Sequence, residues 1–287
     1  MTPKISLCAS ANRIRWWPRL IESLRGNKYP FEVVFAGNIE PDFDMARYPE
    51  LKWIYTTVKP AQAYQIAFWN ATGELIGWTA DDATYDDFSP VALDIAYDAW
   101  SKLDAQYGND RKSALAMNPC EDGGWPQLKF HKLFGGWEET PSMAPFGILD
   151  REYFVNKLGG YDKHFVSGQS ENDVIMRVYE DGGRLEICMD AKLYVHHSEV
   201  HPKRHNGKSF TPFRYDYNKD RERLENCWIK GGYGFYEKLN SFRNNNPDSR
   251  KEVVANISKT RILPFEPFEK NDTYLTASQG EKGQWLI

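Results

Sequence analysis

Cysteine is scarce in this chain, and its few cysteines do not have the spacing of a redox or metal motif. Cys8, Cys120, Cys188 and Cys227 lie far apart, and no two of them form a C-x-x-C pair. In a chain of 287 residues this pattern favours reduced thiols in a cytosol-like compartment over a disulfide framework. We therefore expect a cytoplasmic protein.

Long apolar runs and an excess of positive charge are missing as well. No stretch approaches the roughly 20 residues that span a bilayer, and the start, "MTPKISLCASANRIRWW", turns polar too early for a signal peptide. We expect a soluble protein without a transmembrane segment. The net charge of -4 gives no general electrostatic case for binding nucleic acid, and the basic stretch 201–208 is too short to indicate one.

Several common catalytic motifs are absent. The glycine pairs at 159–160, 182–183 and 231–232 do not occur in a G-x-G-x-x-G or G-x-x-x-x-G-K-[ST] context. No G-x-S-x-G motif occurs either. These absences count against a dinucleotide-binding fold, a P-loop NTPase and a Ser-His-Asp hydrolase.

The first half of the chain alternates between two kinds of apolar pattern. Short apolar runs typical of strands cover 4–9, 31–37, 51–58 and 74–79, and runs with helical spacing cover 15–26, 61–73 and 88–103. This alternation predicts an α/β domain with a mainly parallel sheet flanked by helices. The pattern weakens from about residue 207, so we expect a domain over 1–206 and a helical or irregular C-terminal extension, 207–287, packing on it.

In such a sheet, ligands bind beyond the carboxyl ends of the strands. This rule places residues 9–12, 37–38, 57–59 and the pair Asp81–Asp82 along one edge. Two carboxylates at a strand end suit Mg²⁺ or Mn²⁺, which usually shares phosphate ligands. The alternative is equally compatible with the sequence: these aspartates, with Asp86 and Asp87, precede a helix whose dipole favours acidic residues.

A second acidic pair, Glu171 and Asp173, lies in the first turn of a helix predicted over 170–183, with Ser170 as a plausible N-cap. A carboxylate placed there can act as a general base if it reaches an acceptor hydroxyl, but taken by itself the pair favours the alternative, helix capping. Four of the six histidines fall between residues 196 and 205 without a standard zinc spacing. A histidine that completes a site begun by Asp82 is the more economical hypothesis.

The order of these segments is similar to that of a known enzyme family. "SANR", "ATGELIGWTADDAT", "FGILDREYFVNKLGGYDKHF", "SENDVIMRVYEDGG" and "LYVHH" follow one another over roughly residues 4–200. This order resembles the family 2 glycosyltransferases. The resemblance implies a GT-A, Rossmann-like fold and metal-dependent, inverting transfer from a nucleotide sugar to a saccharide or other hydroxyl acceptor. A UDP-sugar is the favoured donor, and a GDP- or dTDP-sugar is also compatible.

The resemblance also implies roles for single residues. Asp82 would bind Mn²⁺ or Mg²⁺ on the donor diphosphate, and Asp81 would contact the ribose or support the metal. Glu171 matches the catalytic base, with Asp173 as the second candidate. His196 or His197 matches a histidine that binds the metal or the diphosphate. The remaining nucleotide-contacting positions are Ala9, Asn12, Arg13 and Asn38.

Three departures from the family pattern bear on these roles. "FAGN" replaces the usual "DDGS" turn after the second strand, the metal motif "TADD" lacks the first acidic residue of D-x-D, and "SEND" is offset by one residue from the usual acidic pair. The incomplete metal motif keeps a non-catalytic nucleotide-sugar-binding module as an alternative. A nucleotidyltransferase is a weaker alternative, because "LCASANRIRWW" contains no glycine.

Two tryptophans lie between the metal motif and the expected base. Trp125 and Trp137 belong to a segment, 118–141, rich in glycine and proline. They are candidates for stacking on an acceptor sugar or base, and they are equally suited to holding the loop against the core.

Overall fold

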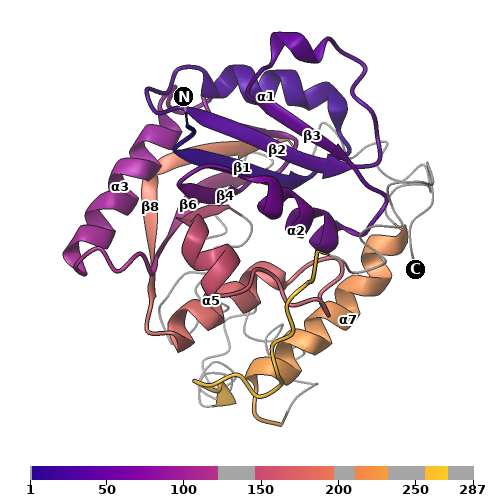
Figure 1. Ribbon diagram of the computed structural model, residues 1–287, viewed down its shortest axis with the longest axis vertical. Coiled ribbons are helices and arrows are strands. Elements are labelled where there is room, and N and C mark those ends of the chain that lie inside the picture. Colours follow the sequence, from indigo (N-terminus) through magenta and orange to yellow (C-terminus); the bar gives the residue numbers. More distant parts are fainter. Residues whose placement is uncertain (1, 122–145, 197–210, 232–255, 271–287) are drawn as a thin grey trace.

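One eight-stranded sheet organises the molecule. The computed structural model describes residues 2–121, 146–196, 211–231 and 256–270. The strand order is β3-β2-β1-β4-β7-β6-β8-β5 (Figure 1). Its strands are β1 (Ile5–Ser10), β2 (Phe31–Gly37), β3 (Leu51–Tyr55), β4 (Leu75–Trp78), β5 (Ala83–Thr84), β6 (Ser113–Glu121), β7 (Gly147–Asp150) and β8 (Arg184–Val195).

The sheet is mixed. Strands β1 to β4 pair in parallel, as the alternating pattern predicts. Strand β7 runs antiparallel between β4 and β6, β6 and β8 pair in parallel, and β5 runs antiparallel to β8. The expected fold class, a mainly parallel mixed sheet flanked by helices, is therefore confirmed, while the reversal at β7 was not predicted.

Helices cover both faces of the sheet. They are α1 (Trp17–Leu24), α2 (Pro60–Asn70), α3 (Ala92–Gln106), α5 (Ser170–Glu180) and α7 (Thr211–Trp228). Shorter turns of 3-10 or π-helix form η1 (Ile14–Trp16), η2 (Met45–Arg47) and η3 (Tyr153–Lys157). Among the described residues no helix combines the length and apolar character that a membrane crossing requires.

The two faces form separate hydrophobic clusters because successive side chains of a strand point to opposite sides. Leu7 packs in the cluster with α1 and α3, and its neighbour Cys8 packs in the cluster with α2, α5 and α7. All four cysteines lie in the described part of the chain and are free thiols, as the sequence predicts.

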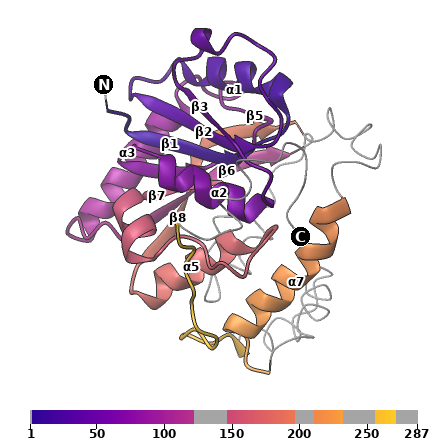
Figure 2. The same ribbon diagram turned by 45° about the vertical axis from the view of Figure 1, so that its right-hand side comes forward.

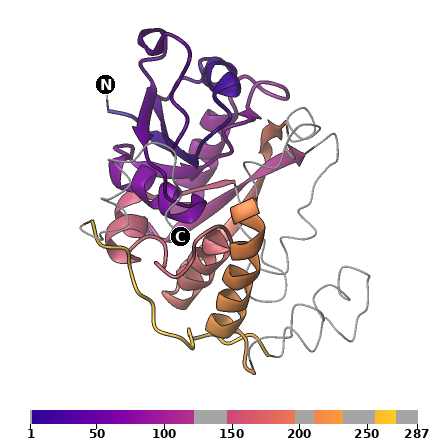
Figure 3. The same cartoon turned by 90° about the vertical axis from the view of Figure 1, so that its right-hand side faces the viewer.

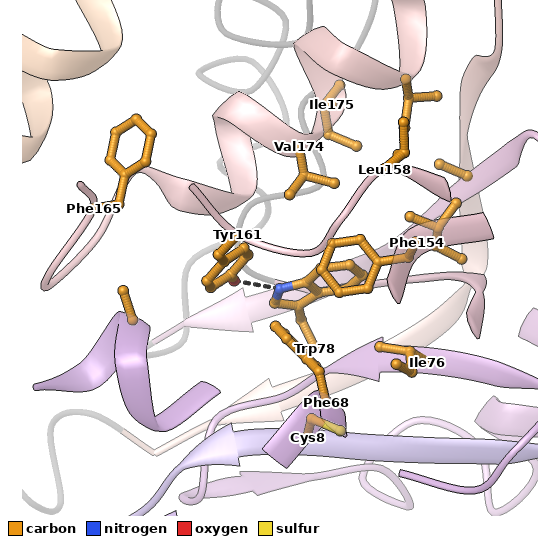
Figure 4. Close-up of a cluster of buried hydrophobic side chains, with 14 of the residues drawn as sticks. Cys8, Phe68, Ile76, Trp78, Phe154, Leu158, Tyr161, Phe165, Val174 and Ile175 are labelled. Carbon is orange, nitrogen blue, oxygen red and sulfur yellow. Dashed lines mark hydrogen bonds between the residues drawn. The ribbon is translucent and has the colours of Figure 1, made fainter. Parts of the chain in front are cut away.

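Trp78 fixes the end of β4 against the second half of the chain (Figure 4). Its indole N–H donates to the Tyr161 hydroxyl over 2.5 Å, and the rings of Phe68 and Phe154 pack against it with centroids 5.3 and 5.0 Å away. Because Trp78 is followed at once by the acidic segment 79–82, this buried cluster positions that segment relative to α5.

The C-terminal part packs on the same core. Leu224, Cys227 and Trp228 of α7 belong to the cluster with α2 and α5, and α7 lies beside α5 (Figure 3). The segment 256–270, yellow in Figure 2, passes α5, and its Arg261 bonds to Asp162 and Asp173. The described parts of the extension therefore share a core with the sheet, and the division at residue 206 stays a prediction.

Arg261 makes a testable contribution to stability. Its side chain is 5% exposed and compensates two carboxylates that are fully buried. Removing one partner of a buried ion pair costs about 3–5 kcal/mol. Arg177 still pairs with Asp173 and Arg223 with Asp162, so Arg261→Ala should lower the free energy of unfolding toward the lower end of this range, by about 3 kcal/mol. Urea denaturation measures this change.

The matched control is Arg25→Ala, because Arg25 is exposed and pairs with Glu50 at the surface. Exposed pairs contribute about 1 kcal/mol or less. Equal losses in the two variants would contradict a structural role for the Arg261 contacts.

Candidate functional site

The carboxyl ends of β1, β2 and β4 lie at one edge of the sheet because the three strands are parallel. Asn12 and Arg13 follow β1, Asn38 follows β2, and Asp81 and Asp82 follow β4. The structure thus brings these five predicted residues to one edge. Ala9 lies within β1, where its side chain is buried in the hydrophobic cluster.

Asp81 holds the loop after β1 in place. Its Oδ2 accepts the backbone N–H groups of Asn12 at 2.7 Å and Arg13 at 2.6 Å, and the indole N–H of Trp17 at 3.3 Å. The Arg13 guanidinium donates to its other oxygen. A carboxylate that is 1% exposed needs such donors, so Asp81 and Arg13 form one fixed unit.

Strand β2 ends at a glycine, Gly37, because the backbone at this position leaves no room for a side chain. A Cβ at this position would lie 1.8 Å from the carbonyl oxygen of Ala11. The chain after β2 therefore passes directly against the loop that Asp81 holds. This close approach accounts for the glycine of "FAGN", and half-buried Asn38 follows it at the edge of the site.

Asp82 and His196 are neighbours although they lie far apart in the sequence. The antiparallel pairing of β5 with β8 sets Ala83 opposite Val195, and His196 N–H donates to the Asp82 carbonyl over 3.1 Å. The Asp82 side chain is fully buried, with its Oδ2 3.4 Å from Nε of Arg13. Sheet register therefore brings together two of the predicted metal-binding residues.

The His196 ring is held between aromatic neighbours. It stacks on Trp16 with centroids 4.3 Å apart, lies 4.6 Å from the Tyr194 ring, and its Nε2 is 2.8 Å from Oγ1 of Thr84. Trp16 was not among the predicted site residues, and the sequence carries no motif that would have identified it. His197, Trp125 and Trp137 lie outside the described residues.

The donor set near Asp82 is compatible with a divalent metal that shares its shell with a ligand. Within the described ranges no three His, Cys, Asp or Glu side chains gather in a complete metal site. Mg²⁺ and Mn²⁺ in nucleotide sites take only one or two carboxylates and complete the shell with phosphate and water. Asp82, with His196 beside it, fits this smaller requirement.

Glu171 is the second residue of α5. Burial raises the pKa of Glu171 to about 7, and the negative charge of Asp220 adds to this effect. Burial, Glu171 and Asp81 in turn raise the pKa of Tyr64. The Tyr64 hydroxyl donates to the Thr79 carbonyl over 2.7 Å, and the charges of both Glu171 and Asp81 act on this side chain of α2. Sequence reasoning missed it.

Asp173 has a different environment from Glu171. It is fully buried and accepts hydrogen bonds from Arg177 Nε at 2.8 Å, the Trp228 indole at 2.9 Å and Arg261 Nε at 3.1 Å. These donors surround its oxygens. Asp173 therefore links α5 to Trp228 and Arg261 in the C-terminal part of the chain. Glu171 is the better candidate for a general base.

Comparisons with known proteins identify similar folds. No protein-family model matches the chain, and no curated protein matches it in sequence. Among solved structures, TarS from S. aureus (residues 1–349) in complex with UDP-GlcNAc has a TM-score of 0.53 at 15% identity, covering 88% of this chain and 70% of that chain. The same protein with UDP gives 0.52.

A second similar structure is the mannosyltransferase PcManGT from Pyrobaculum calidifontis in complex with GDP-Man and Mn²⁺. Its TM-score is 0.51 at 14% identity, with 89% of this chain and 69% of that chain covered. At such identities the likeness shows the fold alone. Together with the observed sheet it gives this chain a GT-A, Rossmann-like fold.

The raised pKa of Glu171 predicts a pH-dependent cost in stability. Between its ordinary pKa of 4.5 and about 7, the folded protein retains a proton that the unfolded chain releases, so the free energy of unfolding falls as pH rises. Glutamine cannot ionise. Glu171→Gln should match the wild type at pH 4.5 or below and be more stable at pH 8, by up to about 3 kcal/mol.

Urea denaturation at the two pH values measures this difference. Glu186→Gln is the control, because Glu186 is exposed on β8 and its replacement should leave the pH dependence as in the wild type. A Glu171→Gln variant with the wild-type pH dependence would show that this carboxyl ionises as freely in the folded protein as in the unfolded chain.

Proposed function

We propose that this protein is a glycosyltransferase of the family 2 type, which transfers a sugar from a nucleotide-sugar donor to an acceptor hydroxyl with inversion. The observation that carries the proposal is the pairing of two acidic groups on a GT-A fold. Asp81 and Asp82 lie at the carboxyl edge of the parallel strands, and Glu171 is a separate, half-buried carboxyl with a raised pKa. The similar folds bound to UDP-GlcNAc and GDP-Man support a nucleotide-sugar donor.

The donor side of the proposal uses the edge of the sheet. The fixed loop Asn12–Arg13, with Asp81 and Asn38, would contact the nucleotide, and Ala9 would contribute through its position in β1. Asp82 and His196 would hold Mn²⁺ or Mg²⁺, which when bound would neutralise charge on the leaving diphosphate. His197 stays an alternative to His196. A UDP-sugar is the favoured donor, and GDP- and dTDP-sugars remain in the proposal.

The acceptor side of the proposal uses Glu171. Its carboxylate would take the proton of the acceptor hydroxyl while the oxygen attacks the anomeric carbon, and the bond from that carbon to the diphosphate would break with its electron pair leaving on the phosphate oxygen. A general base works best when its pKa lies near the working pH, and the value near 7 meets this condition. The acceptor would be a saccharide or another hydroxyl compound.

One observation favours a second candidate, a nucleotide-sugar-binding module without turnover. Arg13 pairs with both Asp81 and Asp82, so the acidic pair already faces a cation of the protein itself. The first candidate predicts transfer or hydrolysis of a nucleotide sugar in the presence of Mn²⁺. The second predicts binding without either reaction.

Replacing the proposed base should abolish turnover and leave binding intact. Glu171→Gln keeps the size of the side chain but cannot accept the proton, so kcat should fall about 10²- to 10⁴-fold. The measurement is transfer and hydrolysis of a panel of UDP-, GDP- and dTDP-sugars with Mn²⁺. In the wild type the rate should rise with pH through about 7 as Glu171 ionises.

Donor affinity is the internal control of this experiment, since Glu171→Gln should bind the nucleotide as the wild type does. Glu186→Gln, at an exposed position, should retain full activity. A Glu171→Gln enzyme with wild-type kcat would remove Glu171 from the proposed role.

Replacing Asp82 should act on the metal-dependent part of donor binding. An amide is a much weaker ligand for Mn²⁺ than a carboxylate, so Asp82→Asn should lose the gain in UDP affinity that Mn²⁺ gives the wild type. Calorimetric titration with UDP, with and without Mn²⁺, measures this gain. Asp86→Asn is the matched control, because Asp86 lies close to Asp82 in the sequence but pairs with Arg19 at the surface. An unchanged titration of Asp82→Asn would exclude Asp82 as a metal ligand.

A further inference from the structure

A buried carboxylate in the C-terminal extension contacts the segment that leads to Glu171. Asp220 of α7 is 1% exposed. Its side chain accepts the backbone N–H of Val166 at 3.0 and 3.1 Å on its two oxygens, that of Ser167 at 2.5 Å, and that of Gly168 at 2.8 Å. Three consecutive amides thus converge on one side chain from a distant part of the sequence, an arrangement that suits an anionic acceptor.

The loop that these amides belong to sets the start of α5. Gln169 follows it with a φ of +64°, α5 begins at Ser170, and Glu171 is the next residue. On its other side the loop is held by the first turn of α2, where Ala61 N–H donates to the Val166 carbonyl over 2.9 Å. The loop 166–168 is therefore fixed between α7 and the helix that carries Tyr64.

We propose that Asp220 is a positioning residue for Glu171, acting through the three amides of the loop that precedes α5. This proposal assigns part of the candidate site to the C-terminal extension. Its catalytic consequence rests on the proposed function of Glu171, whereas the structural coupling between the two carboxyl groups does not.

Asp220 also affects Glu171 through charge. The titratable groups that face Glu171 from the described neighbouring elements are Tyr64 of α2, Tyr161 after η3 and Asp220 of α7. On α5 itself, Asp173 is paired with Arg177 and Arg261. Tyr64 and Tyr161 are neutral, since burial raises the pKa of both. Asp220 is thus the group in this set whose negative charge opposes ionisation of Glu171.

Two substitutions distinguish the effect of the Asp220 hydrogen bonds on the loop from the effect of its negative charge on Glu171. The Oδ2 atom of Asp220 accepts from all three amides, so the amide oxygen of Asp220→Asn can retain these bonds while the charge is lost. Asp220→Ala loses both the bonds and the charge. The matched control is Asp94→Asn. Asp94 is also a buried helical carboxylate that accepts consecutive backbone N–H groups, those of Lys28 and Tyr29. These two residues precede the N-terminal end of β2, away from the edge that carries the candidate site.

The test is an NMR titration of the Glu171 carboxyl carbon in the full chain labelled with ¹³C-glutamate, with Glu171→Gln used for assignment. The midpoint should move to lower pH in Asp220→Asn and stay unchanged in Asp94→Asn. Hydrogen exchange of the amides 166–168 should be faster in Asp220→Ala by about tenfold or more, and close to the wild-type rate in Asp220→Asn. The acidic limb of the pH–rate profile should move in the same direction as the NMR midpoint.

An unchanged Glu171 midpoint in Asp220→Asn would overturn the electrostatic coupling, and unchanged exchange in Asp220→Ala would overturn the positioning role. If Asp220→Ala does not fold, exchange of the three amides in the wild-type protein at the rate of unstructured amides would likewise overturn that role. A wild-type protein that shows the NMR shift but turns over no nucleotide sugar would refute the proposed function and retain the coupling.

Discussion

A carboxylate that is removed from water must find hydrogen-bond donors, and this constraint shapes the main junctions of the molecule. Asp81 accepts hydrogen bonds from the backbone amides of the loop after β1. Asp173 accepts them from Arg177, Arg261 and the Trp228 indole. Asp220 accepts them from the backbone amides that precede α5. Each of these carboxylates joins segments that are distant in the sequence. The sheet supplies the frame, and the acidic residues fix the loops that lie on its edge.

Glu171 differs from these three carboxylates in its electrostatic balance. Burial and the charge of Asp220 outweigh the contribution of its own backbone N–H, which raises its pKa to about 7. A strongly shifted group near a ligand-binding edge is a candidate for proton transfer. The contrast with Asp173, only two residues further along α5, shows how the surroundings of a carboxyl, more than its place in a motif, decide which of two neighbours is suited to chemistry.

Local patterns in the sequence were sufficient to predict the parallel part of the sheet and the residues that lie at its carboxyl edge, the proposed ligand-binding edge. Alternation of apolar runs predicted β1 to β4 with their helices, and the strand-end rule then placed Asn12, Arg13, Asn38, Asp81 and Asp82 together. The antiparallel insertion of β7 and the bounds of the long helix α7 within the expected helical or irregular extension were not predicted, because both depend on packing between distant segments. The hydrogen-bond partners of Asp173 and Asp220 could not be predicted for the same reason. The sequence position of a carboxylate does not reveal which distant donors will reach it.

We propose that the acidic edge binds the donor while Glu171 faces its reacting carbon. The most direct measurement is a crystal structure of the protein with a UDP-sugar and Mn²⁺. We expect a diphosphate at the edge formed by Arg13, Asp81 and Asp82, a metal ligated by Asp82, and the Glu171 carboxylate on the side of the anomeric carbon opposite the diphosphate. A nucleotide bound away from this edge, or a donor whose anomeric carbon turns away from Glu171, would contradict it.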